Sequence, residues 1–400
     1  MATFQVITQI ADIAEQDWQT LLPERYPFLS YPFLQALEDS GCMGGDSGWH
    51  PEYLLHRDAS NRPDWILPLF RKHHSYGEYV FDWGWADAYQ RHGFRYYPKL
   101  LCAAPFTPAT GPRLLYHNAT NPAPWQDAIE ALQQHCRDQQ ASGWHLNFPN
   151  SSDLAELKTL TEQQGYLLRQ ACQFHWFNRN YTNFEHFLEF FTSRKRKSVR
   201  KERQRVRDMN IHIRRLTGEQ LTADVIKRFY QCYQLTYLKR GQQGYLNNTF
   251  FLQLAATMNQ QMMLVEASHN EQHLASALYF FDDHTLYGRY WGCKEEVDGL
   301  HFEACYYQGI EFCLEHGLDH FDPGTQGEHK ISRGFEPVIT SSIHQLQHPD
   351  FQAAVADFIE QEIPQILNYQ QQAATLLPFR ENAFDDLPAT PHTSAPLPQP

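Results

Sequence analysis

The sequence lacks the features that would place the chain in a membrane or outside the cell. The first Lys or Arg is Arg25, so no positively charged segment with an apolar stretch and a cleavage site follows Met1. The most apolar stretch, 274–281, is far shorter than the roughly 20 residues that cross a bilayer. Eight cysteines are scattered without a Cys-x-x-Cys pair, which is typical of reduced, buried cysteine. We therefore expect a cytoplasmic protein with no membrane span.

Familiar nucleotide, nucleophile and metal motifs are missing as well. Rossmann and P-loop proteins share the α/β periodicity described below, but no G-x-G-x-x-G opens a helix and no G-x-x-x-x-G-K-[ST] occurs. No G-x-S-x-G or H-E-x-x-H occurs. His316 and His320 are four residues apart, but Gly317 interrupts the helix that would align them. We expect no metal site and no tightly bound cofactor.

The residues that are present suffice for two folded domains. The chain has 400 residues, 42% hydrophobic and 14% aromatic, which is more than one hydrophobic core usually organises. Its formal net charge is −13, so the surface as a whole should not attract nucleic acid or an anionic membrane. An anionic partner would have to meet a local basic patch.

Turn residues divide the chain into alternating helices and strands. A Gly-aromatic pair, Gly165-Tyr166, recurs 169 residues later as Gly334-Phe335, which indicates a duplicated domain, with chance similarity of α/β units as the alternative. We predict an α+β (α/β) protein with mixed sheets flanked by helices. The expected helices are 30–40, 124–140, 153–164, 301–316 and 351–372, and the expected strands are 65–70, 77–82, 144–148, 170–177, 262–267, 274–281, 285–291, 320–322 and 337–346.

The expected domains are 1–175 and 176–372, the second of which includes a basic helix at 194–207. Five of the last fourteen residues are proline, so 373–400 is expected to be a disordered tail.

The basic helix is the clearest local feature. Nine of the fourteen residues in 194–207 are Lys or Arg, and only Glu202 is acidic. Like charges four residues apart destabilise an isolated helix, and a bound anion would offset that repulsion. The segment therefore predicts a site for a phosphate-bearing ligand such as coenzyme A, a nucleotide-linked precursor or tRNA, and the alternative is a solvated charged face. The expected phosphate-binding residues form one helical stripe: Arg196, Arg200, Arg203 and Arg207.

A polar loop, 321–335, follows a predicted strand, which is where α/β folds place ligands. Acyl transfer to an amine needs a group that accepts a proton and donors aimed at the carbonyl oxygen. The alternative is a capped turn with surface charges. The candidate catalytic residues are Glu328, His329, Asp322 and Arg333, and Gln326 and Lys330 are candidate substrate contacts.

Further substrate contacts are expected outside this loop. Arg289 lies in an aromatic strand, where it is either paired in the core or aimed into a cleft. Glu303 lies near a helix N-terminus, which the helix dipole alone would also favour. A dense aromatic and acidic cluster in the first half forms either a ligand wall or an inter-domain contact. Its candidate residues are Asp82, Trp83, Trp85 and Tyr89, followed by Lys99.

The sequence resembles a known bacterial family, the FemAB-like "peptidoglycan biosynthesis/recognition" family of N-acyltransferases with the GNAT fold. The resemblance runs from about Tyr31 to Ile366. The segments that carry it are YVFDWGWADAY (79–89), YYPKLLCAAPFTPATGPRLL (96–115), RKRKSVRKERQRV (194–206), YWGCKEEVDGLHFEACYYQGIEFC (290–313) and FDPGTQGEHKISRGFEPV (321–338).

This resemblance implies tandem GNAT-like domains and a cytosolic N-acyltransferase. The carrier would be acyl-CoA or aminoacyl-tRNA, and the acceptor a small-molecule amine or a peptidoglycan precursor. The GNAT pyrophosphate loop, Q/R-x-x-G-x-G/A, is not found after Trp291, which disfavours acetyl-CoA and favours tRNA or another bulky donor. The alternative function is a catalytically degenerate module that binds a cell-wall precursor or RNA.

Overall fold

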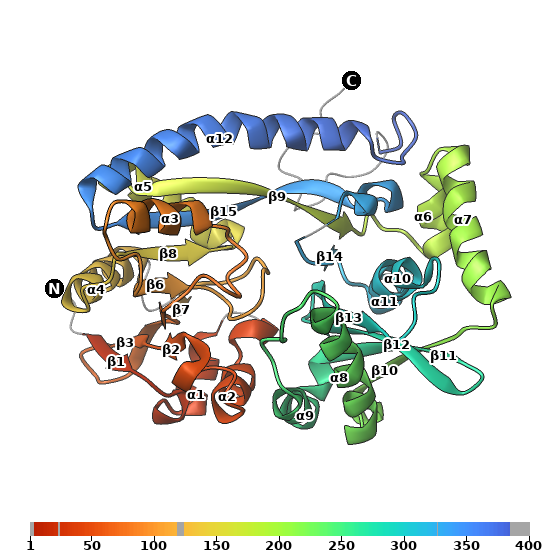
Figure 1. The fold of residues 1–400 in the computed structure, drawn as a ribbon, viewed down its shortest axis with the longest axis horizontal. Coiled ribbons are helices and arrows are strands. Elements are labelled where there is room, and N and C mark those ends of the chain that lie inside the picture. Colours follow the sequence, from red (N-terminus) through yellow and green to blue (C-terminus); the bar gives the residue numbers. More distant parts are fainter. Residues whose placement is uncertain (1–3, 23–24, 118–123, 326, 385–400) are drawn as a thin grey trace. The chain divides into compact units, whose positions relative to one another are not determined.

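The computed structural model describes residues 4–22, 25–117, 124–325 and 327–384 (Figure 1). The chain forms two compact units, one of residues 1–171 with 340–366 and the other of 172–339 with 367–400. The first division falls four residues before the expected boundary at 175. Residues 340–366 belong to the first unit because 342–346 pair with strand β8 (Gly143–Asn147).

Two sheets lie in the described part of the first unit. The smaller is antiparallel, in the order β1 (Phe4–Ile7), β3 (Tyr53–Arg57), β4 (Pro63–Leu67) and β7 (Leu115–Tyr116). The other has the order β15 (Glu336–Leu346), β8, β6 (Lys99–Cys102), β5 (Phe70–Lys72) and β2 (Trp49–Pro51). β6 and β8 are parallel, and helix α4 (Pro124–Asp138) lies between them in the chain. This is the crossover unit that the helix and strand rhythm predicts.

The helices of the first unit bury their apolar faces. α4 buries Trp125, Ile129, Leu132 and Cys136, the four positions at helical spacing in the sequence. α5 begins after the capping side chain of Asn150 and ends at Gly165 in the left-handed conformation. The described helices that lie within or enter this unit are α1 (Glu15–Leu21), α2 (Tyr31–Asp39), α3 (Trp83–Arg91), α4, α5 (Ser151–Gln164) and α12 (Pro349–Thr375).

One strand expected in the first unit is not formed. Residues 77–82 are a loop rather than a strand, and the aromatic segment after them is helix α3 rather than a loop. Glu78 and Asp82 are buried where they contact the ammonium group of Lys99. In an extended strand these two positions would share a face but lie about 13 Å apart, so the chain must bend to bring both carboxylates to one cation.

The second unit is built on one sheet in the order β10 (His212–Thr217), β11 (Met262–His269), β12 (Gln272–Phe281), β13 (Thr285–Cys293), β14 (His320–Asp322) and β9 (Leu167–Phe177). Only β13 and β14 pair in parallel among these neighbours. The chain between β13 and β14 forms a nearly continuous helical segment. It consists of α10 (Leu300–Phe302), a π-helical turn (Glu303–Tyr307) and α11 (Gln308–His316).

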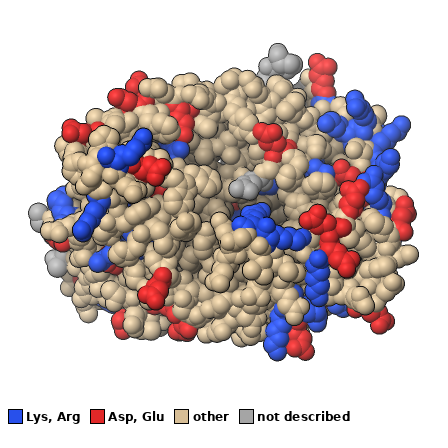
Figure 2. Space-filling view, in the orientation of Figure 1, with Lys and Arg blue, Asp and Glu red and all other residues tan. Residues whose placement is uncertain are grey.

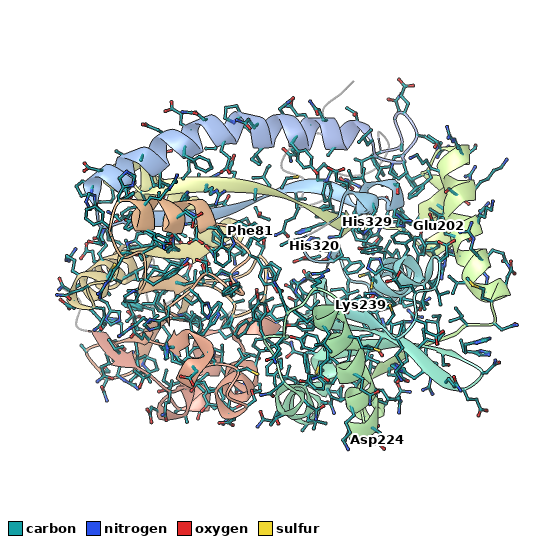
Figure 3. All side chains as sticks on the ribbon, viewed as in Figure 1. Phe81, Glu202, Asp224, Lys239, His320 and His329 are labelled. Atoms are coloured by element: carbon teal, nitrogen blue, oxygen red, sulfur yellow. The ribbon has the colours of Figure 1, made fainter. Side chains whose placement is uncertain are left out.

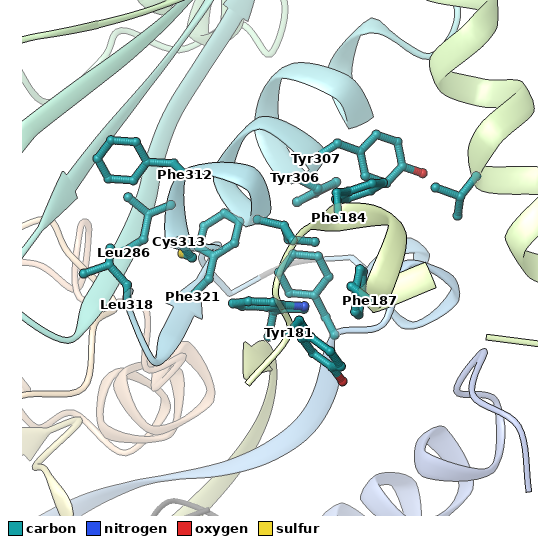
Figure 4. Packing of buried hydrophobic residues seen from close by; sticks show 14 of the residues in the cluster. Tyr181, Phe184, Phe187, Leu286, Tyr306, Tyr307, Phe312, Cys313, Leu318 and Phe321 are labelled. Atoms are coloured by element: carbon teal, nitrogen blue, oxygen red, sulfur yellow. The ribbon is translucent and has the colours of Figure 1, made fainter. Parts of the chain in front are cut away.

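The remaining described helices of the second unit are α6 (Phe184–Glu189), α7 (Ser193–Asp208), α8 (Ala223–Leu238) and α9 (Asn248–Thr257). α7 matches the expected basic helix. The core is strongly aromatic, and Figure 4 shows Phe184, Tyr306 and Tyr307 close together within it. In the described part of the chain, no helix combines the length and the apolar character that a membrane span requires.

Part of the expected tail is ordered. α12 extends to Thr375, and Phe379 packs edge-on against Phe191 with ring centroids 5.3 Å apart. The guanidinium of Arg179 lies 4.5 Å from the ring centroid of Phe384. The rest of the expected tail, 385–400, lies outside the described residues.

Candidate functional site

A pocket opens in the second unit where two parallel strands part. β13 and β14 pair over three residues only, Thr285–Tyr287 with His320–Asp322. β13 then continues to Cys293, whereas the chain leaves β14 at Pro323. The pocket is lined by Ala277, Leu278, Tyr279, Gly288, Arg289, Tyr290, Trp291, His301, Cys305, Tyr306 and Pro323.

A β-bulge places Arg289 at this divergence. Leu278 pairs with Tyr290 but Tyr279 pairs with Gly288, so Arg289 is the extra residue of β13. Its Nη2 lies 2.8 Å from Oδ2 of Asp322, and both side chains are almost fully buried. Arg289 is thus both paired and part of a pocket wall, which combines the two alternatives that its sequence position left open.

Asp322 is held by several partners. Its Oδ1 accepts a hydrogen bond from the Gly324 amide at 2.8 Å and lies 3.7 Å from Nε2 of His175. Burial alone would raise the pKa of Asp322, but the charge of Arg289, together with His175 and the hydrogen bonds, holds it well below its usual range. Asp322 is therefore an ionised structural anchor of the pocket, and its role as one of the candidate catalytic residues stays a prediction.

Lys330 is buried in the loop that follows. Its Nζ donates to the Gly324 carbonyl at 2.5 Å, and its side chain is 1% exposed. Burial lowers the pKa of Lys330 to about 8, although the nearby Asp322 opposes the shift. The ammonium group fixes the bend of the loop beside the pocket.

Two imidazoles and a phenol converge on the pocket. The Tyr306 hydroxyl and Nε2 of His329 are 2.7 Å apart, and the rings of His301 and Tyr306 are 5.4 Å apart. Burial, with smaller effects from His329 and Arg333, lowers the pKa of His301 to about 4. Burial and the charges of Arg333 and Lys330 also lower the pKa of His329. Both imidazoles are therefore neutral at pH 7 and can accept a proton.

The sequence did not single out Tyr306, because its position depends on the π-helical turn. The extra residue of such a turn shifts the face on which the following side chains lie. His175 was also missed, since it lies in β9, far from the loop in sequence. A histidine that alternates with buried aromatic residues in a strand is the only signal that could have marked it.

Arg333 does not line the pocket. Its Nη2 lies 2.9 Å from both carboxylate oxygens of Glu202 on α7, and its Nη1 donates to the His329 carbonyl at 2.6 Å. Its guanidinium also lies 3.4 Å from the ring centroid of Phe302. These contacts occupy Nη1 and Nη2, whereas the buried Nε has no hydrogen-bond partner among the described residues. Arg333 therefore anchors the loop to α7.

Glu303 and Arg203 also bind each other. Nε and Nη2 of Arg203 lie 3.0 and 2.8 Å from the two carboxylate oxygens of Glu303. Nη1 of Arg203 lies 2.6 Å from Glu311, and the guanidinium lies 4.5 Å from the ring centroid of Phe184. The expected substrate role of Glu303 and the expected phosphate role of Arg203 stay predictions, and each would require this ion pair to open.

The rest of the α7 stripe is more exposed. Arg196 is half-buried, whereas Arg200 and Arg207 are exposed. Arg200 pairs with Glu185 and Arg207 donates to Gln204. Figure 2 shows Lys and Arg side chains gathered at the edge of the molecule where Figure 1 places α7. The other exposed cations of α7 are Arg194, Lys197, Lys201 and Arg205.

The remaining candidate residues of the 321–335 loop lie on the outer side of that loop. Glu328 is exposed and accepts a hydrogen bond from the Tyr369 hydroxyl at 2.8 Å. His329 is exposed on one side while its ring contacts Tyr306. Gln326 lies outside the described residues. The end of the loop needs glycine, because Gly334 has a φ of +87° and a Cβ there would lie 2.7 Å from the ring of Phe187.

The first-unit candidates form a separate buried cluster. Lys99 contacts Asp82, Glu78 at 2.7 Å and Ser75 at 2.9 Å, and the Tyr96 hydroxyl donates to Asp82 at 2.6 Å. Burial raises the pKa of Glu78 to about 7 against the opposing charge of Lys99. Asp82 and Lys99 are thus brought together as a buried ion pair inside the unit.

The first-unit aromatic residues divide between surface and core. Trp85 is buried beside His344, with ring centroids 5.0 Å apart, and Tyr89 stacks on Phe351 at 3.8 Å. Trp83 is 40% exposed and contacts the ring of exposed Tyr76. Of the aromatic candidates, only Trp83 is left available to a ligand of the first unit.

Within the described ranges, no group of three or more His, Cys, Asp or Glu side chains is arranged to hold a metal ion. His301, Tyr306 and His329 can transfer protons and form hydrogen bonds at the pocket.

Comparison with known proteins gives the chain a family. The sequence pattern of the FemAB-like family, described as peptidoglycan biosynthesis/recognition, matches residues 9–381. A search of curated protein sequences finds no match. Among solved structures the chain is similar to FemX, with 11% identity, a TM-score of 0.55 and coverage of 86% of this chain and 98% of that chain. It is also similar to a conserved protein of unknown function from Bacteroides thetaiotaomicron, with 10% identity, a TM-score of 0.51 and coverage of 86% and 99%.

These structures share the fold, which confirms the expected mixed α/β architecture of tandem GNAT-like units. The family match covers nearly the whole chain, including α7 and the π-helical turn. It also covers a short 3₁₀ helix (Glu328–Arg333) with Gly327 and Gly334 at its ends, which we call the 327–334 loop. The chain therefore belongs to the FemAB-like family of peptidoglycan biosynthesis/recognition proteins.

Proposed function

We propose that the chain is an N-acyltransferase that moves an acyl or aminoacyl group from a phosphate-bearing carrier to an amine, in the pocket of the second unit. The observation that supports this most directly is the convergence of neutral His301 with the Tyr306–His329 pair where β13 and β14 part. Family membership supports an amine of a peptidoglycan precursor as the acceptor.

The reaction forms a bond from the amine nitrogen to the carbonyl carbon and breaks the bond from that carbon to the carrier's oxygen or sulfur. The amine loses one proton, and the leaving atom gains one. His301 is the proton acceptor, because it is neutral at pH 7 and lines the pocket. Tyr306 delivers a proton to the leaving atom, since burial raises the pKa of Tyr306 and keeps it protonated. His301 then passes the proton taken from the amine to Tyr306, whose ring centroid lies 5.4 Å away, so both groups end as they began. Neutral His329 orients the Tyr306 hydroxyl through their hydrogen bond.

The carrier is proposed to meet the outer face of α7. Arg194, Lys197, Lys201 and Arg207 are exposed there in a protein whose net charge is −13. A polyanion gains from each phosphate that a Lys or Arg neutralises. Aminoacyl-tRNA fits this extended cationic face better than acyl-CoA, which remains the other carrier of the same chemistry.

A binding module without chemistry is the second candidate. It is favoured by one observation, namely that Asp322, Glu303 and Arg333 are all engaged in internal ion pairs. Two candidate catalytic residues, Asp322 and Arg333, and one candidate substrate contact, Glu303, are thus ion-paired within the protein. Such a protein would bind a cell-wall precursor or RNA and release it unchanged.

The deciding experiment offers the purified full chain labelled aminoacyl-tRNAs and, separately, labelled acyl-CoAs, each with a nucleotide-linked peptidoglycan precursor that bears a free amine. Transfer of label to the precursor supports the enzyme. His301→Gln should lower kcat by about 10²-fold and keep precursor binding, because only proton transfer is lost. The matched control is His212→Gln, an exposed histidine of β10. Precursor or RNA binding with no transfer from any donor would favour the module instead.

A further inference from the structure

The basic helix contains one acidic residue in the run 194–207, and that residue is turned inward. Both carboxylate oxygens of Glu202 lie 2.9 Å from Nη2 of Arg333. Oε2 of Glu202 also accepts a hydrogen bond from the Tyr307 hydroxyl at 2.5 Å. Figure 3 labels Glu202 on the edge of α7 that faces His329. One carboxylate of α7 therefore holds both the 327–334 loop and the π-helical turn.

The contact continues from Arg333 to the pocket. Nη1 of Arg333 donates to the carbonyl oxygen of His329, whose ring contacts the hydroxyl of Tyr306. Tyr306 lines the pocket. Glu202 is thus separated from a pocket side chain by Arg333 and His329 alone.

The next residue of α7 makes a parallel contact. Arg203 pairs with Glu303, which is the first residue of the π-helical turn that carries Tyr306 and Tyr307. Val199 and Val206 are the buried residues of α7. Because so little apolar surface holds this helix, the inward ion pairs decide how it docks.

We infer that Glu202 is a positioning residue that links polyanion binding on the outer face of α7 to the order of the 327–334 loop. A polyanion relieves the repulsion among the cations of α7 and stabilises the helix in its docked position. The Glu202–Arg333 pair then transmits that stability to the loop. Linkage is reciprocal, so an ordered loop strengthens polyanion binding by the same factor. This inference rests on the proposed function, in which the carrier binds α7 and the loop serves the reaction.

Amide hydrogen exchange of the full chain with and without poly(U) RNA tests the link. In the wild type, poly(U) should slow exchange both in α7 and in 327–334 several-fold. Glu202→Gln should keep the protection of α7 and lose that of the loop. The matched control is Glu185→Gln, which removes the same charge from an exposed pair with Arg200 on the same helix and should behave as the wild type. No change in loop exchange in the wild type, or full loop protection in Glu202→Gln, would overturn the inference.

A second, milder variant tests the same link in case Glu202→Gln does not fold. Tyr307→Phe removes one hydrogen bond to Glu202 and should reduce loop protection partly, while unchanged protection in a folded Tyr307→Phe counts against the link. Where transfer is measurable, Glu202→Gln should lower kcat and leave the donor KM within about 2-fold. Absence of transfer in the wild type contradicts the proposed function, whereas the exchange data decide the link independently.

Discussion

Arg203 and Glu303 form a buried two-point ion pair between the basic helix and the π-helical turn. The Arg203 side chain is 13% exposed and the Glu303 side chain 6% exposed. Gln308 adds a hydrogen bond to the same carboxylate at 2.8 Å. The contribution of such a pair to protein stability depends on its geometry and its burial. Breaking the pair by removing one partner leaves the other charge unpaired in the protein interior.

Arg203→Ala is accordingly expected to destabilise the protein far more than Arg200→Ala. Removing Arg203 leaves Glu303 buried and unpaired, which costs about 3–5 kcal/mol. Removing Arg200 breaks an exposed pair with Glu185, worth at most about 1 kcal/mol. Urea unfolding of the two variants measures the difference. Equal losses of the free energy of unfolding would show that the position of Arg203 in the helix stripe does not matter.

Charge reversal on the outer face of α7 should weaken polyanion binding. Lys201→Glu removes a phosphate contact, so the affinity for poly(U) falls and the slope of log K against log salt shrinks by about 0.7. The control is Lys227→Glu, an exposed lysine of α8 whose reversal changes the net charge equally. Titration at several salt concentrations gives both slopes. The role of α7 is refuted if the two variants bind alike.

Tyr306→Phe should reduce turnover without unfolding the second unit. The ring stays in the aromatic core, and only the hydroxyl that contacts His329 is lost. We expect kcat to fall by about 10²-fold with the acceptor KM little changed. Tyr287→Phe is the control, because its hydroxyl binds Asp282 and it does not line the pocket. An equal fall of kcat in both variants would show that the Tyr306 hydroxyl takes no part in the reaction.

The sequence predicted much of the fold because its strongest patterns are local. The helices 124–140 and 153–164 formed within two residues of the expected ends, since apolar spacing and caps at Asn150 and Gly165 act over short distances. Gly165 and Gly334, the repeated pair that indicated duplication, both adopt a positive φ. Loop 77–82 was mistaken for a strand because the ion pairs that bend it depend on Lys99, seventeen residues or more away.

The sequence predicted where the polar loop lies, whereas the roles of its residues stay predictions. The 321–335 loop does lie beside the pocket, as its position after a strand indicated. The sequence could not show that Asp322 forms an ion pair with a residue of β13 and Arg333 one with a residue of α7. Ion pairs between residues so far apart in the sequence leave no local pattern. The π-helical turn that presents Tyr306 is likewise invisible to a periodicity of 3.6 residues.

Lys330 should make stability depend on pH in the alkaline range. Its pKa is about 8 in the folded protein, below the usual 10.4 of the unfolded chain, so the unfolded state binds more protons between these values. Stability contributed through Lys330 therefore rises as pH increases from 8 to 10.4. Lys330→Met should lose about 2–3 kcal/mol relative to the wild type between pH 7.5 and 10.5, as measured by urea unfolding. A difference that stays constant with pH would contradict this.

In the first unit, a pair of buried histidines should make stability depend on pH in the acidic range. Nδ1 of His145 and Nδ1 of His344 are 2.7 Å apart, so one nitrogen must donate while the other accepts. Burial, followed by the charge of Lys99, lowers the pKa of His145 to about 3, and burial followed by His145 itself lowers that of His344. Below pH 6.5 the unfolded chain binds more protons than the folded unit, so stability falls as pH falls.

His344→Gln removes one of these buried imidazoles and its contact with Ser342 at 2.8 Å. The variant should be less stable than the wild type at pH 7.5, because the Nδ1 contact is lost. Its stability should then decline less steeply between pH 6.5 and 4.5, by up to about 1.4 kcal/mol per pH unit for the proton no longer taken up on unfolding. Urea midpoints at four pH values measure the two slopes. Parallel slopes would mean that His344 is already protonated in the folded unit, which would contradict the lowering of its pKa by burial.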